Sequence, residues 1–210
     1  MSFLRRPFRY RYENITLFLI GITILVFLAQ QLFARQYLSE YLAMIPLAVV
    51  INGWVWQFVT YMFAHGGLTH LLFNMLALFI FGSQVERRIG SREFLLYYLL
   101  TGILAGVFSF GVYWFTGAYR IHLVGASGAI FAVQLAYATF FPDAVIFIWG
   151  ILPMRAPIMV LAFTLLELFS SFFDHRSGIA HFTHLAGFGF GWIYFLVRFG
   201  INPWKALTSR

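Results

Sequence analysis

Cysteine is absent from this 210-residue chain, and only 10% of its residues are charged. Without cysteine there are no disulfides, no thiolate catalysis and no cysteine-ligated metal. A water-soluble domain of this size carries about 25% charged residues to cover its surface. Here 61% of the residues are hydrophobic, and 27 of them are Phe. The shortage of charge therefore places the chain in a lipid bilayer and excludes a soluble enzyme, a disordered tail and a nucleic-acid-binding protein.

Apolar runs recur along the chain at roughly the 20-residue length that a helix needs to cross about 30 Å of hydrocarbon. Turn signals such as Asn52-Gly53 and Pro142-Asp143 separate them. The first 14 residues are basic and polar and precede a run long enough to span, so we expect an N-terminal anchor and no cleavable signal peptide. The sequence predicts an all-α polytopic membrane protein with one domain over residues 1–210. The six predicted spans are residues 15–33, 60–84, 94–115, 127–141, 157–173 and 181–199.

Basic residues are distributed unevenly between the two sides of this topology. With the N-terminus in the cytoplasm, eleven of the 14 Lys and Arg residues fall in inside segments. The outside segments hold only Arg35, Arg120 and Arg176. The positive-inside rule therefore predicts that both termini are cytoplasmic. A short chain without a transit peptide favours the inner membrane of a prokaryotic cell.

Two connecting segments are unusual. Residues 34–59 are nearly as apolar as the spans and contain Trp54, Trp56 and Phe58, which predicts an interfacial flap in the headgroup region of the outer face. The fourth span is too short to cross the bilayer, so residues 117–126 must dip inward to meet it. Irregular backbone at membrane depth requires surrounding protein or a water-filled cavity. The sequence therefore predicts a polar cavity that opens outward.

Polar residues inside the spans are informative, because burying them is costly unless they have partners or a function. Four of them fall in one layer when depth is counted at about 1.5 Å per helical residue. Ser127 and His184 lie roughly 21–22 Å above the inner boundary, between Asn74 and His70 at roughly 20 and 26 Å. The full set is His65, His70, Asn74, Ser127, Glu167, His181 and His184.

Ser127 opens the fourth span within the Gly-Ala-Ser-Gly motif of residues 125–128. Glycines let backbone approach a ligand, and the unpaired N–H groups at the positive end of a helix favour a developing oxyanion. A histidine at matching depth, His184, can act as the base for the serine hydroxyl. His70 and Asn74 lie at i and i+4 on one helix face, so both are able to donate to the same oxyanion. The predicted site is the catalytic dyad Ser127 and His184, with His70, Asn74 and Gly125 around the oxyanion and substrate.

Each of these residues also has a structural interpretation. Small residues in transmembrane helices usually serve close packing, and Asn74 could join two helices by a hydrogen bond. His181 and His184 have the i, i+3 spacing of zinc ligands, but no further ligand completes a site, so no metal is predicted. Glu167 is interpreted as a protonated or paired glutamate, with a wall of the substrate path as the alternative. Asp174 could orient His184, but no spacing requires it, so we expect a dyad.

Three glycines continue the sixth span after His184. Glycines at i and i+4 form a flat groove that lets a neighbouring backbone approach closely. Such a groove against the fourth helix would hold Ser127 and His184 within hydrogen-bond reach. The predicted facing sets are Gly187, Gly189 and Gly191 on the sixth helix, and Gly128, Ala132 and Ala136 on the fourth.

Four motifs occur in order across residues 58–191. They are His65-Gly-Gly-Leu-Thr-His70-Leu-Leu-Phe-Asn74, Val85-Glu86-Arg87-Arg88-Ile-Gly90, Gly125-Ala-Ser127-Gly128-Ala-Ile-Phe131 and His184-Leu-Ala-Gly187-Phe-Gly-Phe-Gly191. Together they resemble the rhomboid family of intramembrane serine proteases. The chain departs from the family at two positions, where Gln57 replaces a frequent Arg and Thr183 replaces a common Ala.

The resemblance implies a six-helix rhomboid core with Ser127 as nucleophile, His184 as general base and a mobile cap over the fourth helix. It also implies an oxyanion site formed by the Ser127 backbone N–H with His70 and Asn74, and a structural role for Glu86. Family substrates are single-span membrane proteins, cut near the outer face at small residues beside a helix-unstable segment. No cofactor or metal is implied. We therefore predict an intramembrane serine endopeptidase whose partners are membrane-protein substrates and the lipid bilayer.

Two other functions fit parts of the sequence. A catalytically inactive rhomboid-like protein would bind membrane helices in quality control, but inactive relatives usually lack the serine or the histidine. A small transporter would use His70, Asn74 and Glu167 as a proton or ion path. Against a transporter, no inverted repeat is visible and the polar layer opens to one side. The sequence leaves the physiological substrate and the oligomeric state open.

Overall fold

Helices lie at each of the six stretches that the sequence predicted to span the bilayer. The computed structural model describes residues 5, 8–33, 35–148, 150–173 and 178–208, with side chains except at 35–36, 167–173 and 178–180. Among the described residues, three helices are long and apolar enough to cross a membrane: Ile15–Leu32, Leu68–Ile89 and Ser91–Phe115. The first stretch is α1 (Ile15–Leu32). The second is one continuous run of three elements: α5 (Leu68–Ala77), the π-helix η2 (Leu78–Gly82) and α6 (Ser83–Ile89). The remaining four are α7 (Ser91–Phe115), α8 (Ser127–Phe140), α9 (Ala156–Phe173), and α10 (Gly178–Tyr194) followed by the π-helix η3 (Phe195–Phe199).

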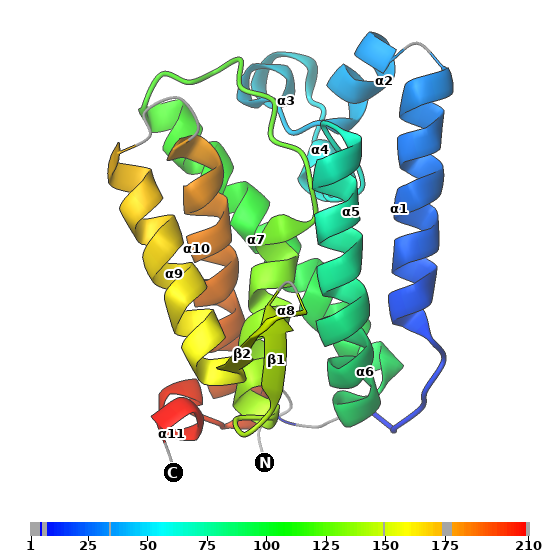
Figure 1. Cartoon of the computed structure of the whole chain (residues 1–210). Coiled ribbons are helices and arrows are strands. Elements are labelled where there is room, and N and C mark those ends of the chain that lie inside the picture. The colour runs from blue at the N-terminus through cyan, green and yellow to red at the C-terminus, as the bar shows by residue number, and fades with distance from the viewer. Residues whose placement is uncertain (1–4, 6–7, 34, 149, 174–177, 209–210) are drawn as a thin grey trace.

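Helix α8 lies in the centre of the bundle, where it packs against α7, α9, α10 and η2 (Figure 1). A helix that is apolar on all sides is buried on all sides, and α8 follows this rule because small residues dominate its sequence. Residues 117–126 run from the end of the bundle that carries α3 (Pro46–Asn52) down to the start of α8 (Figure 1). Ten residues of α8 are buried: Gly128, Ala129, Ile130, Ala132, Val133, Gln134, Leu135, Ala136, Ala138 and Thr139.

The predicted interfacial segment is folded into three short helices at one end of the bundle, which we call the α3 end (Figure 1). They are α2 (Arg35–Leu42), α3 and α4 (Gln57–Thr60). Aromatic rings stack there, with centroids of Tyr41, Trp54 and Trp56 separated by 5.0–5.7 Å. The opposite end carries α6 and α11 (Pro203–Thr208), and we call it the α6 end.

Gln57, which stands where the resembled family often has arginine, anchors this segment. The side chain is fully buried. Its Oε1 accepts from the Ile45 N–H at 3.0 Å, and its Nε2 donates to the Glu40 carbonyl at 2.9 Å. A neutral amide therefore joins α4 both to α2 and to the connection between α2 and α3 without burying a charge.

The second predicted span begins later than the sequence analysis placed it. Helix α5 starts at Leu68, whereas the prediction began at residue 60, and residues 61–67 form turns. Hydropathy alone does not detect this break, because the segment stays apolar up to Gly66 and Gly67, which disfavour helix. His65 consequently lies before the helix and not inside it, contrary to the prediction.

The all-α prediction is also wrong in one place. The connection between α8 and α9 is an antiparallel hairpin of β1 (Val145–Ile148) and β2 (Leu152–Arg155), paired from Val145 opposite Arg155 to Ile148 opposite Leu152. Strand β1 alternates between exposed and half-buried residues, the pattern of a strand with one covered face. Its β-branched and aromatic residues favour a strand over a helix in so short a run.

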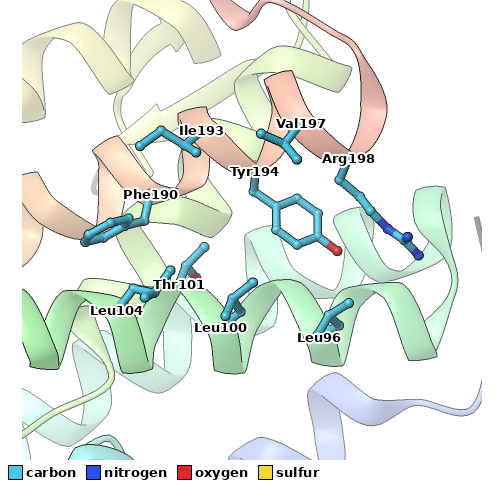
Figure 2. A pocket seen from close by; sticks show the side chains of 9 residues that line it. All are labelled: Leu96, Leu100, Thr101, Leu104, Phe190, Ile193, Tyr194, Val197 and Arg198. Atoms are coloured by element: carbon cyan, nitrogen blue, oxygen red, sulfur yellow. The ribbon is translucent and has the colours of Figure 1, made fainter. Parts of the chain in front are cut away.

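Two buried carboxylates, Glu93 and Glu86, join helices at the α6 end. Glu93 in α7 accepts from the Tyr194 hydroxyl at 2.5 Å and from Arg198 Nε at 2.7 Å and Nη2 at 2.8 Å. This bidentate pair joins α7 to η3. Figure 2 shows Arg198 at one end of an apolar cavity of about 230 Å³, which lies between α7 and the run of α10 and η3; Tyr194 also lines it. The other lining residues are Leu96, Leu100, Thr101, Leu104, Phe190, Ile193 and Val197.

Glu86 in α6 caps the N-terminus of α1, which has no capping side chain of its own. Asn14, at the N-cap position, makes no side-chain cap hydrogen bond. Instead Glu86 accepts from the backbone N–H of Ile15 at 2.7 Å, the N–H of Thr16 at 2.8 Å and the Thr16 hydroxyl at 2.7 Å, and it also accepts from Ser91 Oγ. A carboxylate at a helix N-terminus satisfies unpaired donors and interacts favourably with the helix dipole. The side chain is fully buried, so this contact fixes α1 to the bundle.

Replacing Glu86 with glutamine is expected to lower the free energy of unfolding by about 2–4 kcal/mol, because the variant leaves buried donors without the charged acceptor. Thermal unfolding in detergent, followed by tryptophan fluorescence, measures the loss. Glu13→Gln is the matched control, since that carboxylate is partly exposed at the same end and pairs only with Arg11 among the described residues. Equal melting temperatures for the two variants would contradict the capping role.

Candidate active site

Ser127 is the first residue of α8, and the chain before it is held by backbone contacts. Met44 and Leu123 exchange a pair of N–H to carbonyl bonds, both of 3.0 Å. The Gly125 N–H donates to the Tyr61 carbonyl at 2.8 Å. Gly125 has φ +110°, a conformation that favours glycine. The start of α8 is therefore positioned from outside the helix as well as from within it.

The structure places Ser127 beside His184 of α10. The Ser127 Oγ and His184 Nε2 atoms are 2.7 Å apart, which is hydrogen-bonding distance, and both residues are half-buried. Phe131 stacks on the imidazole with ring centroids 4.6 Å apart and planes within 7°. Sequence reasoning missed this role of Phe131. The signal was its i+4 spacing from Ser127, which puts both side chains on one face of α8.

Glycines at the contact between α8 and α10 let the two helices approach closely enough for this hydrogen bond to form. A Cβ atom on Gly187 would lie 1.9 Å from the Gly128 carbonyl oxygen, so no larger residue fits there. One turn later, a Cβ on Gly191 would lie 3.0 Å from Ala132 Cβ. The predicted groove is confirmed at these two glycines. The prediction is wrong for Gly189, which is exposed because a two-residue step turns it away from α8. A Cβ added there would meet no neighbouring element within 4 Å.

His70 of α5 approaches the same place from the other side. A Cβ on Gly125 would lie 2.6 Å from His70 Cε1 and 2.7 Å from Nε2, so the ring packs directly on the glycine backbone. Asn74 is buried one turn further along α5, and its Nδ2 donates to the His70 carbonyl at 2.9 Å. The structure thus brings together Ser127, His184, Gly125 and His70, with the Asn74 amide engaged within its own helix.

His65 supports this arrangement from outside α5. Its backbone N–H donates to Oε1 of the buried Gln30 in α1 at 3.1 Å, and its ring centroid lies 5.0 Å from that of His70. Burial lowers the pKa of His65 to about 4, and the neighbouring His70 acts in the same direction. His65 is therefore neutral at neutral pH and packs against His70 without adding charge.

Thr183, which stands where the resembled family commonly has Ala, lies beside the site. Its hydroxyl is buried 2.6 Å from Ser109 Oγ in α7. Its Cγ2 atom and carbonyl oxygen would be 3.2 and 3.3 Å from a Cβ on Gly128, the residue after Ser127. Thr183 therefore joins α7, α8 and α10 beside the Ser127–His184 pair.

The remaining predicted polar residues contribute less. His181 and His184 have ring centroids 6.4 Å apart. Within the described part of the chain, no cluster of three or more His, Cys, Asp or Glu residues is arranged to hold a metal ion. The Glu167 side chain and Asp174 lie outside the described residues.

The sequence was compared with protein families and with known proteins, and the matches named below all point to one family. Residues 52–201 match the rhomboid domain family. The Bacillus subtilis protein YdcA, which carries a rhomboid-protease name, is 41% identical over 88 residues, 42% of each chain. The rhomboid protease GluP of Bacillus subtilis is 42% identical over 84 residues, 40% of this chain and 15% of that protein. The rhomboid protease GlpG of Salmonella newport is 29% identical over 140 residues, 64% of this chain and 48% of that protein. The chain thus spans less than half the length of each relative.

Gly187→Ala is expected to destabilise the protein by about 1–3 kcal/mol, because the added methyl group has to push α10 away from the α8 backbone. The matched control is Gly189→Ala, two residues along the same helix, where the methyl group enters open space and the helix gains stability of about 0.5–1 kcal/mol. Melting temperatures of the two variants therefore move in opposite directions. A stable Gly187→Ala protein would show that the close helix contact is not required.

Proposed function

Because the chain belongs to the rhomboid family, we propose that it is an intramembrane serine endopeptidase that uses Ser127 and His184. The observation that supports this most directly is the 2.7 Å contact between Ser127 Oγ and His184 Nε2. A serine hydroxyl is a weak nucleophile unless an adjacent base takes its proton. Here the pair is half-buried among packed helices, and a transmembrane protein offers little other use for such a contact.

The proposed reaction has two steps. Ser127 Oγ attacks the scissile carbonyl carbon while His184 Nε2 accepts the hydroxyl proton, and that proton then passes to the leaving amine as the C–N bond breaks. Water next attacks the acyl-enzyme while His184 Nε2 accepts a proton from it, and that proton passes to Ser127 Oγ as the acyl C–O bond breaks, which releases the new C-terminus and regenerates both residues. The stacked Phe131 ring holds the imidazole plane during both transfers.

The oxyanion of each tetrahedral intermediate is proposed to lie between α8 and α5. The backbone N–H of Ser127 sits at the helix N-terminus, where donors are unpaired and the dipole is positive. The His70 ring lies against Gly125, so it can reach the same space. Asn74 would join them by exchanging its contact with the His70 carbonyl for the substrate. Each donor is worth on the order of 3 kcal/mol of barrier.

The proposed setting is a bilayer that the chain crosses six times, as a single domain with both termini in the cytoplasm. In this orientation the α3 end faces outward and residues 117–126 lead from it to Ser127 (Figure 1). Water would enter from that side. The proposed substrates are single-span membrane proteins, cut at small residues beside a helix-unstable segment. The inner membrane of a prokaryotic cell is the proposed location, and the relatives named above are bacterial proteins.

An inactive, helix-binding function is less well supported. It would leave no role for the hydrogen bond between Ser127 and His184, or for the stacking of Phe131 on the imidazole. The transporter alternative also relies on Glu167, whose side chain lies outside the described residues.

A fluorophosphonate probe tests the nucleophile directly. We expect the purified wild-type protein to be labelled at Ser127, located by mass spectrometry, and Ser127→Ala and His184→Ala to remain unlabelled and inactive while still folded. The physical reason is that only a hydroxyl with an adjacent base attacks the probe at a useful rate. Full proteolytic activity in Ser127→Ala would refute the assignment.

The oxyanion donors are tested by kinetics on a transmembrane reporter substrate. His70→Ala and Asn74→Ala are expected to lower kcat by roughly 10²-fold with little change in KM, since the lost hydrogen bonds form mainly in the transition state. We expect the Asn74 variant to be the milder of the two, because its amide starts from a bond within its own helix. Thr69→Ala, an exposed position on α5, serves as the control and should match wild type. Unchanged kcat in both test variants would remove these side chains from the mechanism.

A further inference from the structure

Three arginines surround an open cavity at the α6 end. The cavity has a volume of about 460 Å³ and is lined by Arg9, Tyr10, Arg11 and Arg92. Arg92 is the second residue of α7, one of the helices long and apolar enough to cross a membrane. In the proposed bilayer setting, this places the cavity where α7 leaves the hydrocarbon, at the level of lipid headgroups.

The backbone that carries these arginines is fixed. The Ser91 N–H donates to the Arg11 carbonyl at 2.8 Å, and the Glu13 N–H donates to Ser91 Oγ at 2.7 Å. The Tyr10 hydroxyl donates to the Arg87 carbonyl at 2.9 Å. The segment that carries Arg9 and Arg11 is thus held next to the first turn of α7, and these two arginines line one cavity with Arg92.

The described residues balance the positive charge of this cluster only in part. The nearby carboxylates have other partners, since Glu86 caps α1 and Glu93 binds Arg198. Arg11 Nε lies 3.3 Å from the partly exposed Glu13. Among the described residues, neither Arg9 nor Arg92 forms an ion pair.

An apolar row continues from Arg92 along α7. Leu96, Leu100 and Leu104 follow it at steps of four residues and line the cavity between α7 and α10 (Figure 2). Residues four apart on a helix are neighbours on one face. Leu96 and Leu100 are both 38% exposed. The charged cavity and the apolar groove therefore follow one another along α7, since Arg92 and Leu96 are one turn apart on this helix.

We propose that this surface binds one anionic phospholipid, with its phosphate among Arg9, Arg11 and Arg92 and an acyl chain along the leucine row. Guanidinium groups recognise phosphate oxygens in a bidentate manner. Basic clusters at the cytoplasmic ends of transmembrane helices attract anionic lipids. The lipid links the N-terminal segment to α7 and so stabilises the folded protein. This inference does not depend on protease activity.

Thermal unfolding in an uncharged detergent tests the proposal, with phosphatidylglycerol, phosphatidylcholine or inorganic phosphate added. We expect phosphatidylglycerol to raise the melting temperature of wild type. Phosphatidylcholine should raise it less, and inorganic phosphate should leave it unchanged. In the triple variant Arg9→Gln, Arg11→Gln, Arg92→Gln, the concentration of phosphatidylglycerol needed for half of the shift should rise at least about tenfold. Lys205→Gln removes a charge from the same end outside the cavity, and should respond like wild type.

Native mass spectrometry of the same proteins counts bound lipid without reference to stability. Wild type and Lys205→Gln should retain one phosphatidylglycerol that the triple variant loses, and the single variant Arg92→Gln should retain less than wild type. An equal thermal shift and equal lipid retention in the triple variant would overturn the site. A shift with inorganic phosphate as large as that with phosphatidylglycerol would overturn the lipid as its ligand.

Discussion

The close approach of α8 and α10 at Gly128 and Gly187 is the constraint on which the rest of the structure depends. A hypothetical methyl group on Gly187 meets the Gly128 carbonyl oxygen at 1.9 Å, so the two helix backbones are separated by no side chain at all. Ser127 immediately precedes one of these glycines, and His184 lies one turn before the other. Their 2.7 Å hydrogen bond is therefore a consequence of helix packing. In a bilayer, where apolar side chains gain little by leaving lipid, such backbone proximity is a principal source of helix association.

The two ends of the bundle are held by different kinds of interaction. At the α6 end, Glu86 and Glu93 are buried carboxylates that each accept several hydrogen bonds. At the α3 end, two of the contacts between described residues are neutral: the hydrogen bonds of the Gln57 amide and the backbone pairing of Met44 with Leu123. Hydrogen bonds that involve an ionised group are about twice as strong as neutral ones. The charge-assisted hydrogen bonds named at the α6 end are therefore stronger, bond for bond, than the neutral ones named at the α3 end, which is the end that leads to Ser127.

Much of this arrangement could be predicted from the sequence, because helix length and rise are fixed by the backbone. Apolar runs placed the helices, and counting depth along them put Ser127 and His184 in one layer, as their 2.7 Å contact confirms. Features that depend on local backbone choice could not be predicted in this way. Hydropathy did not register the Gly66-Gly67 break before α5, nor the hairpin of residues 145–155 inside a generally apolar chain. Phe131 was missed because an aromatic residue in a membrane helix carries no signal until its neighbour is known.

Under the proposed mechanism, α8 supplies both the nucleophile and the surface that orients the base. Ser127 and Phe131 are one turn apart on the same face of this helix, and the imidazole of His184 lies against the Phe131 ring while contacting the serine. The distance from nucleophile to orienting ring is then set within a single rigid helix. Only the separation of α8 from α10 remains to be fixed, and the backbone contact at Gly187 fixes it. A stacked aromatic ring can in this way hold a catalytic histidine in a plane by packing, a task that a buried carboxylate performs in water-soluble serine proteases at the cost of burying a charge.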